Sequence, residues 1–195
     1  SFPDCAFDLV TCQTLLIHVS DPVAVLKEML RVLKPGGLLA VAEPNNLANR
    51  LMFDNLSAGD SIEQICQDVE FHLTCERGKI KLGEGNNSIG DLIPGYFAEI
   101  GLQNIQVYIG DKASPMFPTY ASREQQVSKQ MCLDWLDRCT WEQHEALRYF
   151  LAGGGTALDF EAHWLGMLQG NQLAKESLLN ETFHSSGGSL MYLIS

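Results

Sequence analysis

The chain has 195 residues, of which 46% are hydrophobic and 19% charged, and its formal net charge at pH 7 is −11. This composition is typical of a globular protein with a substantial core, while the acidity argues against sequence-independent binding of nucleic acid, which needs clustered lysine and arginine. No apolar run approaches the roughly 20 residues that span a bilayer, so we expect no membrane partner and a cytoplasmic protein.

The first block of the chain reads as a strand, a helix and a second strand. Residues 7–12 and 38–43 are short apolar runs, which are typical of strands buried on both faces of a parallel sheet. Between them, Asp21 is a good N-cap and Pro22 suits the first helical position. The Pro-Gly-Gly at 35–37 is expected to end the helix and turn the chain. This order predicts a parallel crossover.

The next segments predict helices and one more strand. Helical patterns occupy about 47–56 and 61–73, and glycines favour a loop over 76–87. A further helix should start at an Asp91 cap and end at Gly101. Residues 104–109 then alternate into a strand.

Residues 111–188 differ in character and are mostly helical in pattern. Two capping boxes occur at Ser122–Gln125 and Thr140–Gln143, and further helices fit at about 157–169 and 172–183. Residues 189–195 end the chain as an apolar strand.

The six cysteines suggest neither a disulfide framework nor a metal site. No two are spaced C-x-x-C, and no histidine falls at metal-ligand spacing near them. We predict free thiols and no metal ligands.

The strand, the helix, the turn Leu33-Lys34-Pro35-Gly36-Gly37 and the second strand together closely resemble the middle of a class I S-adenosylmethionine-dependent methyltransferase. The resemblance implies an α/β fold: a partial Rossmann-like sheet of about four strands whose last strand pairs antiparallel beside strand 104–109. Residues 1–110 and 189–195 would form the C-terminal half of the methyltransferase core. Residues 111–188 would form a helical insertion that acts as a substrate lid.

Ligands bind at the carboxyl ends of the strands in an open parallel sheet. In the family, the residues just after the fourth strand contact the methionine part of the cofactor. The resemblance therefore assigns cofactor binding to Cys12, Gln13 and Thr14, the alternative being an ordinary exit from the strand. His18 matches a position that is often histidine in the family. It is either a catalytic base or, as we favour, a residue that hydrogen-bonds the backbone of its own loop.

Polar residues after the second strand are candidates for substrate binding. Glu43, Asn45 and Asn46 should face the same cleft as the cofactor residues, although Asn46 is an equally good cap for a helix starting at residue 47. Arg50 either reaches an anionic substrate or pairs with Asp54 four residues on.

The three glycines at 153–155 are the place in this chain where a cofactor loop would be sought. The preceding residues continue a helical pattern from residue 142, so we interpret the run as a turn between helices. The resemblance then implies that the family's first strand and glycine-rich loop are absent from this chain.

The function that the resemblance implies for the intact protein is that of an enzyme, which transfers a methyl group from S-adenosylmethionine to a small-molecule acceptor. A modified nucleoside in RNA is a weaker alternative acceptor. We expect the chain by itself to be inactive, because nothing in it supplies the glycine loop. A second hypothesis is a non-catalytic binding module that dimerises through an exposed strand at 7–12, since open edges recruit strands.

Overall fold

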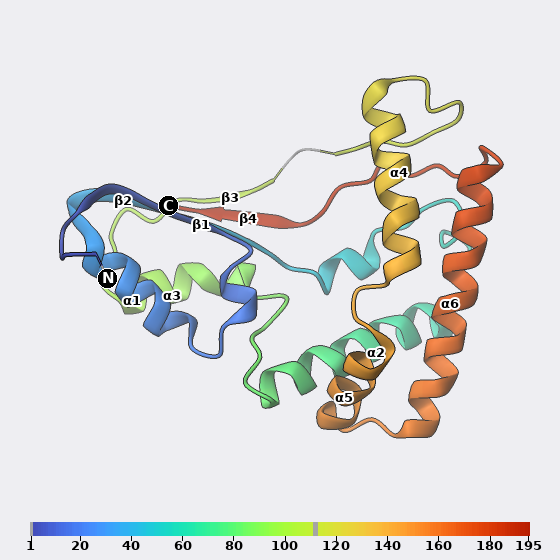
Figure 1. The fold of residues 1–195 in the computed structure, drawn as a ribbon, viewed down its shortest axis with the longest axis horizontal. Helices are drawn as coiled ribbons and strands as arrows, with labels where there is room; N and C mark the ends of the chain where they lie inside the picture. The colour runs from blue at the N-terminus through green and yellow to red at the C-terminus, as the bar shows by residue number, and fades with distance from the viewer. Residues whose placement is uncertain (1, 111–112) are drawn as a thin grey trace. The chain divides into compact units, whose positions relative to one another are not determined.

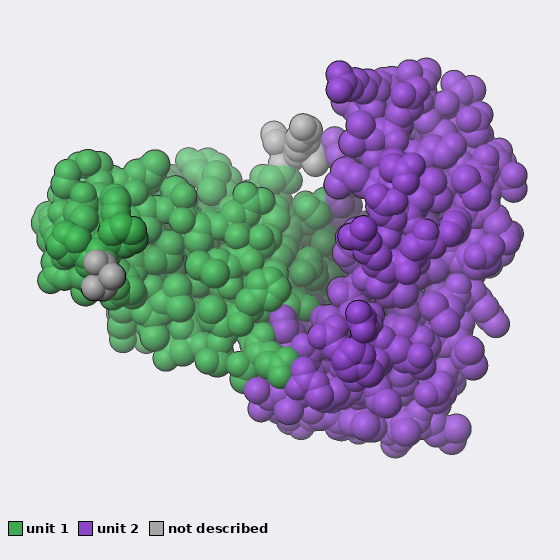
Figure 2. Space-filling model, in the orientation of Figure 1, with its two compact units in different colours: residues 1–49, 83–111, 189–195 green, residues 50–82, 112–188 purple. Residues whose placement is uncertain are grey.

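The computed structural model describes residues 2–110 and 113–195, which form two compact units (Figures 1 and 2). The first unit takes its residues from 1–49, 83–111 and 189–195, and the second from 50–82 and 112–188. Residues 50–82 thus fold with the helical insertion, whereas the sequence analysis places them with the sheet. The described residues include no helix that is both long enough and apolar enough to cross a membrane.

The first unit is built on a four-stranded sheet in the order β1-β2-β4-β3. The strands are β1 (Phe7–Gln13), β2 (Leu33–Pro44), β3 (Val107–Ile109) and β4 (Met191–Ile194). β1 and β2 are parallel, and β4 runs antiparallel to both β2 and β3. The predicted parallel crossover and the antiparallel last strand are both confirmed.

Two helices pack under one face of this sheet, α1 (Pro22–Val32) and α3 (Ile93–Glu99) (Figure 1). Asp21 caps α1 as predicted, since its carboxylate accepts a hydrogen bond from the Ala24 amide at 2.8 Å. Asp91 does not cap α3, which follows a short 3-10 helix, Gly90–Leu92, without a side-chain cap. The core between sheet and helices consists of buried aliphatic side chains and one phenylalanine: Leu16, Ile17, Leu26, Leu33, Leu39, Val41, Ile89, Ile93, Phe97 and Ile194.

The opposite face of the sheet stays open, which corrects the expectation that the strands are buried on both faces. Leu9 of β1 is 54% exposed, Leu38 of β2 is 51% exposed, and Leu193 of β4 is 44% exposed. β1 also has β2 as its one strand partner among the described residues. A parallel sheet is normally covered on both faces, so this apolar surface lacks the cover that its sequence pattern suits.

β2 begins at Leu33, five residues earlier than predicted. The Pro-Gly-Gly turn lies inside the strand, where the pairing with β1 is irregular between Phe7 and Leu9. Gly37 makes this path feasible, because a Cβ there would meet the Asp8 carbonyl oxygen at 2.9 Å. The motif therefore ends the helix without turning the chain out of the sheet.

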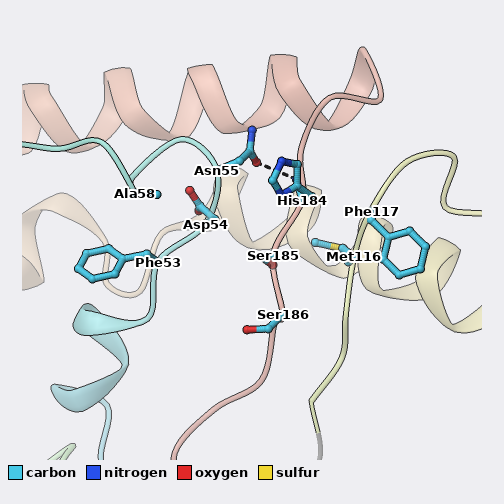
Figure 3. Close-up of a pocket in the computed structure, with 9 residues that line it drawn as sticks. All are labelled: Phe53, Asp54, Asn55, Ala58, Met116, Phe117, His184, Ser185 and Ser186. Atoms are coloured by element: carbon cyan, nitrogen blue, oxygen red, sulfur yellow. Dashed lines mark hydrogen bonds between the residues drawn. The ribbon is translucent and has the colours of Figure 1, made fainter.

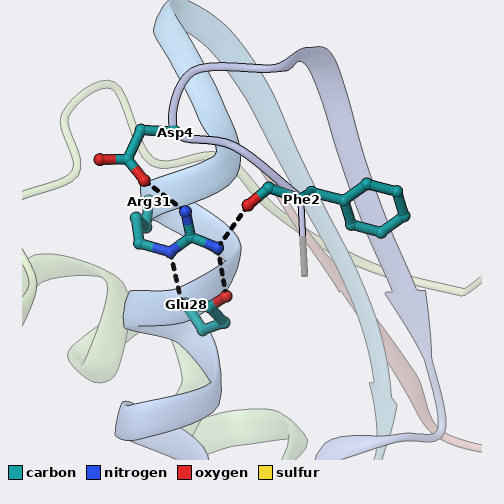
Figure 4. A network of polar contacts seen from close by, with 4 residues as sticks. All are labelled: Phe2, Asp4, Glu28 and Arg31. Atoms are coloured by element: carbon teal, nitrogen blue, oxygen red, sulfur yellow. Dashed lines mark hydrogen bonds and ion pairs between the residues drawn. The ribbon is translucent and has the colours of Figure 1, made fainter.

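Arg31, in the last turn of α1, ties down the segment before β1 (Figure 4). Its guanidinium binds Glu28 through two nitrogens, at 2.6 and 2.7 Å, and also pairs with Asp4. A further bond runs to the carbonyl oxygen of Phe2 at 3.0 Å. These contacts raise the pKa of Arg31 above its usual value, chiefly through the hydrogen bonds to Glu28 and Asp4.

The second unit is helical. Its helices are α2 (Ile62–Lys81), α4 (Arg123–Arg138), α5 (Gln143–Gly153) and α6 (Ala157–Leu179). One cluster of buried residues joins α2, α5 and α6, and comprises Phe71, Cys75, Ala146, Tyr149, Phe150, Phe160 and Trp164. A smaller cluster contains Met116, Tyr120, Leu178 and Phe183.

α2 continues through the predicted loop as far as Lys81. Gly78, a residue that favoured a loop, is a helical position where α5 comes very close: a Cβ there would lie 1.7 Å from the Tyr149 carbonyl oxygen. The predicted helix at 47–56 is reduced to a 3-10 helix, Ala48–Leu51.

The helix boundaries in 111–188 are confirmed in part. Ser122 and Gln125 form the predicted capping box of α4, but α5 is capped by Glu142 and not by Thr140. α6 is one continuous helix where two were predicted. The glycine run ends α5, with Gly154 at a φ of +108°, as predicted for a turn between helices.

Candidate cofactor-binding site

The three predicted cofactor residues lie at the carboxyl end of β1. Cys12 and Gln13 are the last residues of the strand and pair with Val41 and Ala42 of β2. Thr14 follows with a φ of +48°, and its amide donates to the Ala42 carbonyl oxygen at 2.9 Å. Gln13 and Thr14 are exposed and Cys12 is half-buried, so the chain turns away from the sheet at a surface-accessible strand end, where ligands bind in this class of sheet.

Glu43, at the end of β2, binds the next part of this loop. Its carboxylate Oε1 accepts hydrogen bonds from the backbone amides of Leu15 at 2.9 Å and Leu16 at 2.8 Å. The side chain is fully buried, and Oε2 has no hydrogen-bond partner among the described residues. The sequence indicated a substrate contact for Glu43; in the structure it bonds the loop that carries the cofactor residues.

Cys12 is kept in its neutral form by this environment. Burial, followed by the negative charge of Glu43, raises the pKa of the Cys12 thiol to about 11. A thiol with so high a pKa is a poor nucleophile near neutral pH. Cys12 therefore suits a binding role better than covalent chemistry.

His18 ends a 3-10 helix, Leu16–His18, directly after this loop. Its imidazole is exposed and makes no hydrogen bond to the described residues, while its amide donates to the Leu15 carbonyl oxygen at 3.1 Å. Gly85 packs against the same helix, since a Cβ there would lie 2.1 Å from the Ile17 carbonyl oxygen. The side-chain bond to its own loop, which the sequence analysis favoured, is not present.

Asn45, directly after β2, makes two side-chain hydrogen bonds to other segments of the first unit. Its Oδ1 accepts from the Ala48 amide at 3.0 Å, and its Nδ2 donates to the Asp91 carboxylate at 3.1 Å. Asn45 thus caps the 3-10 helix, a role that the sequence analysis gave to Asn46 as an alternative to substrate binding. Asn46 lies beside it, half-buried.

Arg50 belongs to the second unit and bonds a histidine rather than Asp54. Its Nη1 lies 3.1 Å from His72 Nε2, and this histidine nitrogen lies 3.5 Å from the Asp68 carboxylate. Burial acts to raise the pKa of Asp68, but the hydrogen bond to His72 and the nearby basic groups outweigh it and lower this pKa. Sequence reasoning missed this cluster; the spacing of Asp68 and His72, four residues apart on one helix, was the available signal.

The second unit also has an open cavity of about 460 Å³ (Figure 3). Three segments line it, and their lining residues are Phe53, Asp54, Asn55, Ala58, Met116, Phe117, His184, Ser185 and Ser186. Asn55 joins two of these segments, because its Oδ1 accepts from the His184 amide at 2.7 Å. None of the residues predicted from the sequence to bind cofactor or substrate lines this cavity, and no group of acidic, histidine or cysteine side chains in the described chain is placed to hold a metal ion.

Comparison with known proteins shows what the segment containing β1, α1 and most of β2 is similar to. Residues 1–41 match a family model described as "Methyltransferase domain". The ubiquinone/menaquinone biosynthesis C-methyltransferase UbiE of Vibrio vulnificus is 30% identical over 118 residues, which cover 55% of this chain and 42% of UbiE. The 2-methyl-6-phytyl-1,4-hydroquinone methyltransferase of a Synechocystis species is 46% identical over 50 residues, which cover 26% of this chain and 16% of that protein.

A solved structure of a putative methyltransferase from Bacillus halodurans covers 99% of this chain at 14% identity and a TM-score of 0.42, and the match spans 70% of that protein. The chain matches less than half the length of the two curated relatives. Over residues 1–41 the chain is thus similar to a methyltransferase domain, which supports its resemblance to the class I S-adenosylmethionine-dependent methyltransferases over that part. The methyl donor of this family is S-adenosylmethionine.

The loop after β1 fits part of such a donor. It offers exposed residues at Gln13 and Thr14, and Oε2 of the buried Glu43 side chain that binds this loop has no hydrogen-bond partner among the described residues.

Proposed function

We propose that the intact protein transfers a methyl group from S-adenosylmethionine to a small-molecule acceptor. The match of residues 1–41 to the methyltransferase family carries this proposal. In the reaction, an acceptor nucleophile attacks the methyl carbon in line, the carbon–sulfur bond breaks, and the electron pair stays on sulfur to leave a neutral thioether. The acceptor also loses a proton when its nucleophile is a hydroxyl or another protonated group. Such a displacement needs two well-placed partners rather than a protein nucleophile.

Each predicted residue has a role in this proposal. Cys12, Gln13 and Thr14 contact the donor at the end of β1, where the exposure of Gln13 and Thr14 supports access. Asn45 and Asn46, at the end of β2, stand next in the sheet and bind polar groups of the acceptor.

Two further residues belong to the site in this proposal, a histidine and an arginine. His18 is an exposed imidazole with no partner among the described residues, which is compatible with a base. Arg50 binds an anionic group through the nitrogens that His72 does not occupy.

The acceptor that the relatives suggest is a small hydroxylated ring. One relative is named for a hydroquinone and another for ubiquinone and menaquinone biosynthesis. A nucleoside in RNA is a weaker alternative in a chain with a net charge of −11. Methyl transfer to hydroquinones and to RNA, measured with isotope-labelled donor, distinguishes the two.

We also propose that the 195-residue chain by itself has no methyltransferase activity. Among its described residues, the glycine run at 153–155 is a helix end, and no strand is followed by a glycine-rich loop and helix that would hold the donor. The test compares labelled methyl transfer by this chain with that by a protein extended to the length of its relatives. Transfer by the isolated chain at a rate comparable to the longer protein would refute this part of the proposal.

A second candidate function is a non-catalytic binding module that dimerises through β1. The open edge of β1 and the exposed Leu9 favour it. Under this alternative neither this chain nor a longer form transfers methyl groups, and the chain is a dimer in solution.

A further inference from the structure

Glu43 differs from the other predicted site residues in being completely buried. A carboxylate removed from water carries a large desolvation cost unless it is paired or hydrogen-bonded. Two backbone amides bind Oε1, but Oε2 has no hydrogen-bond partner, and no lysine, arginine or histidine in the described chain forms an ion pair with Glu43. The buried Glu43 carboxylate therefore has hydrogen bonds at one of its two oxygens only, which leaves part of its desolvation cost uncompensated.

The Glu43 carboxylate helps to fix the loop that follows β1. Thr14 is tied to Ala42 of β2 through its amide, and the next two amides, of Leu15 and Leu16, are tied to Glu43. Three consecutive amides are thus fixed by two neighbouring residues of one strand. A substitution at Glu43 should therefore change the conformation of the loop that carries Gln13 and Thr14.

The negative charge of Glu43 acts on Cys12, at the end of β1. It contributes, after burial, to the raised pKa of the Cys12 thiol. A buried negative charge interacts more strongly with a nearby cation than a charge surrounded by water does. The loop above Glu43 is therefore a favourable place for a positively charged group and a less favourable one for a neutral group.

We propose that Glu43 is a positioning residue that fixes the loop of residues 13–16 and, through its unpaired charge, favours a cationic ligand there: the sulfonium of the methyl donor over the neutral thioether that remains after transfer. This inference rests on the proposed function, since it assigns the donor to this loop. It deepens that function by giving the chain a means to distinguish donor from spent product by charge alone.

The test compares two ligands that differ by the transferred methyl group and its positive charge, S-adenosylmethionine and S-adenosylhomocysteine. Both are titrated to millimolar concentration and followed by nuclear magnetic resonance of the chain, since weak binding suffices. Glu43→Gln retains an oxygen for the Leu15 and Leu16 amides and removes the charge. Glu99→Gln, at an exposed end of α3, is the matched control.

The parent chain and Glu99→Gln should prefer the sulfonium compound, and Glu43→Gln should lower that preference by about five- to tenfold, because it removes the negative charge that attracts the sulfonium. An unchanged ratio in Glu43→Gln overturns the proposal. Equal binding of the two ligands by the parent chain overturns it as well, whether or not the variant folds.

A second measurement tests the positioning role without ligand. Hydrogen exchange at the Leu15 and Leu16 amides should stay slow in Glu43→Gln and rise at least about tenfold in Glu43→Ala, because only the alanine variant removes the acceptor. Unchanged exchange in Glu43→Ala overturns this role. If the parent chain binds neither ligand even weakly, the assignment of the donor to this loop fails, while the exchange result still decides whether Glu43 fixes the loop.

Discussion

Glu43 and Leu16 connect the ends of two parallel strands, since a carboxylate at the end of β2 accepts the backbone amide that follows β1 at a distance of 2.8 Å. Both residues are fully buried. This bond and its neighbour at Leu15 make the shape of the candidate cofactor loop depend on a single side chain of the next strand.

Replacing Glu43 by alanine should destabilise the first unit. The variant leaves two backbone amides without an acceptor in a buried site, a loss of about 2–4 kcal/mol. Urea unfolding followed by circular dichroism measures this loss, with Glu99→Ala, at an exposed position of α3, as the control. Equal stability of both variants would show that water replaces the carboxylate at no cost.

The cysteines should differ widely in reactivity. With a pKa of about 11 for Cys12 and about 12 for Cys75, only about one Cys12 thiol in a thousand is ionised at pH 8. Alkylation followed by peptide mass spectrometry should therefore label the exposed Cys5 and Cys66 long before Cys12 and Cys75. Labelling of Cys12 as fast as Cys5 contradicts the buried setting of Cys12.

Gly78→Ala should disrupt the packing of α2 on α5. A Cβ at this position would lie 1.7 Å from the Tyr149 carbonyl oxygen, so the helices must separate, at about 2–4 kcal/mol. Gly170→Ala, also within a helix but with no atom within 4 Å of the added Cβ, should instead stabilise α6 by about 0.5–1 kcal/mol. Thermal unfolding of the two variants tests whether their effects have opposite signs.

Asp68 should make a small contribution to the pH dependence of stability. Its pKa is lower in the folded protein than its ordinary value of 3.8, so its pairing with His72 stabilises the fold above that value and is lost as the pH falls through the folded pKa. Asp68→Asn should have a lower free energy of unfolding than the parent at pH 7, and this difference should be smaller at pH 3. Because the carboxylate is half-exposed, the effect is modest. Glu70→Gln on the same helix serves as the control, and parallel pH profiles for parent and Asp68→Asn would contradict the pairing.

The second candidate function makes a prediction about assembly. If β1 recruits a second copy, light scattering shows a dimer that Leu9→Lys converts to a monomer, because the charge is placed on the open apolar face. Leu158→Lys, at a residue of α6 that is 81% exposed, should leave the dimer intact. A parent chain that is already monomeric at high concentration excludes this mode of association.

Local sequence signals predicted the strands of the sheet and its parallel crossover, while the resemblance to the methyltransferase family implied the antiparallel pairing of the last strand. Asp21 and Pro22 defined the start of α1, and the glycine-ended helix before β3 placed that strand near its observed position. These features depend on residues close in sequence, which a pattern can capture.

The errors came from contacts between distant segments. Gly78 looked like a loop residue because its reason for being glycine, the closeness of α5, lies some 70 positions further on. The hydrogen bonds from Glu43 to the Leu15 and Leu16 amides were also missed, because these amides belong to the loop of another strand. The Arg50–His72–Asp68 cluster also needed the helix α2 to bring its members together.

The position of β4 in the sheet has a consequence for synthesis. β4 lies between β2 and β3, yet it follows the whole second unit in the sequence. As the chain leaves the ribosome, the helices of the second unit can pack while β3 still has no strand beside it. The sheet that holds the candidate site is therefore the last part of the described protein to be completed, and truncations within β4 should impair the first unit while leaving the helical one folded.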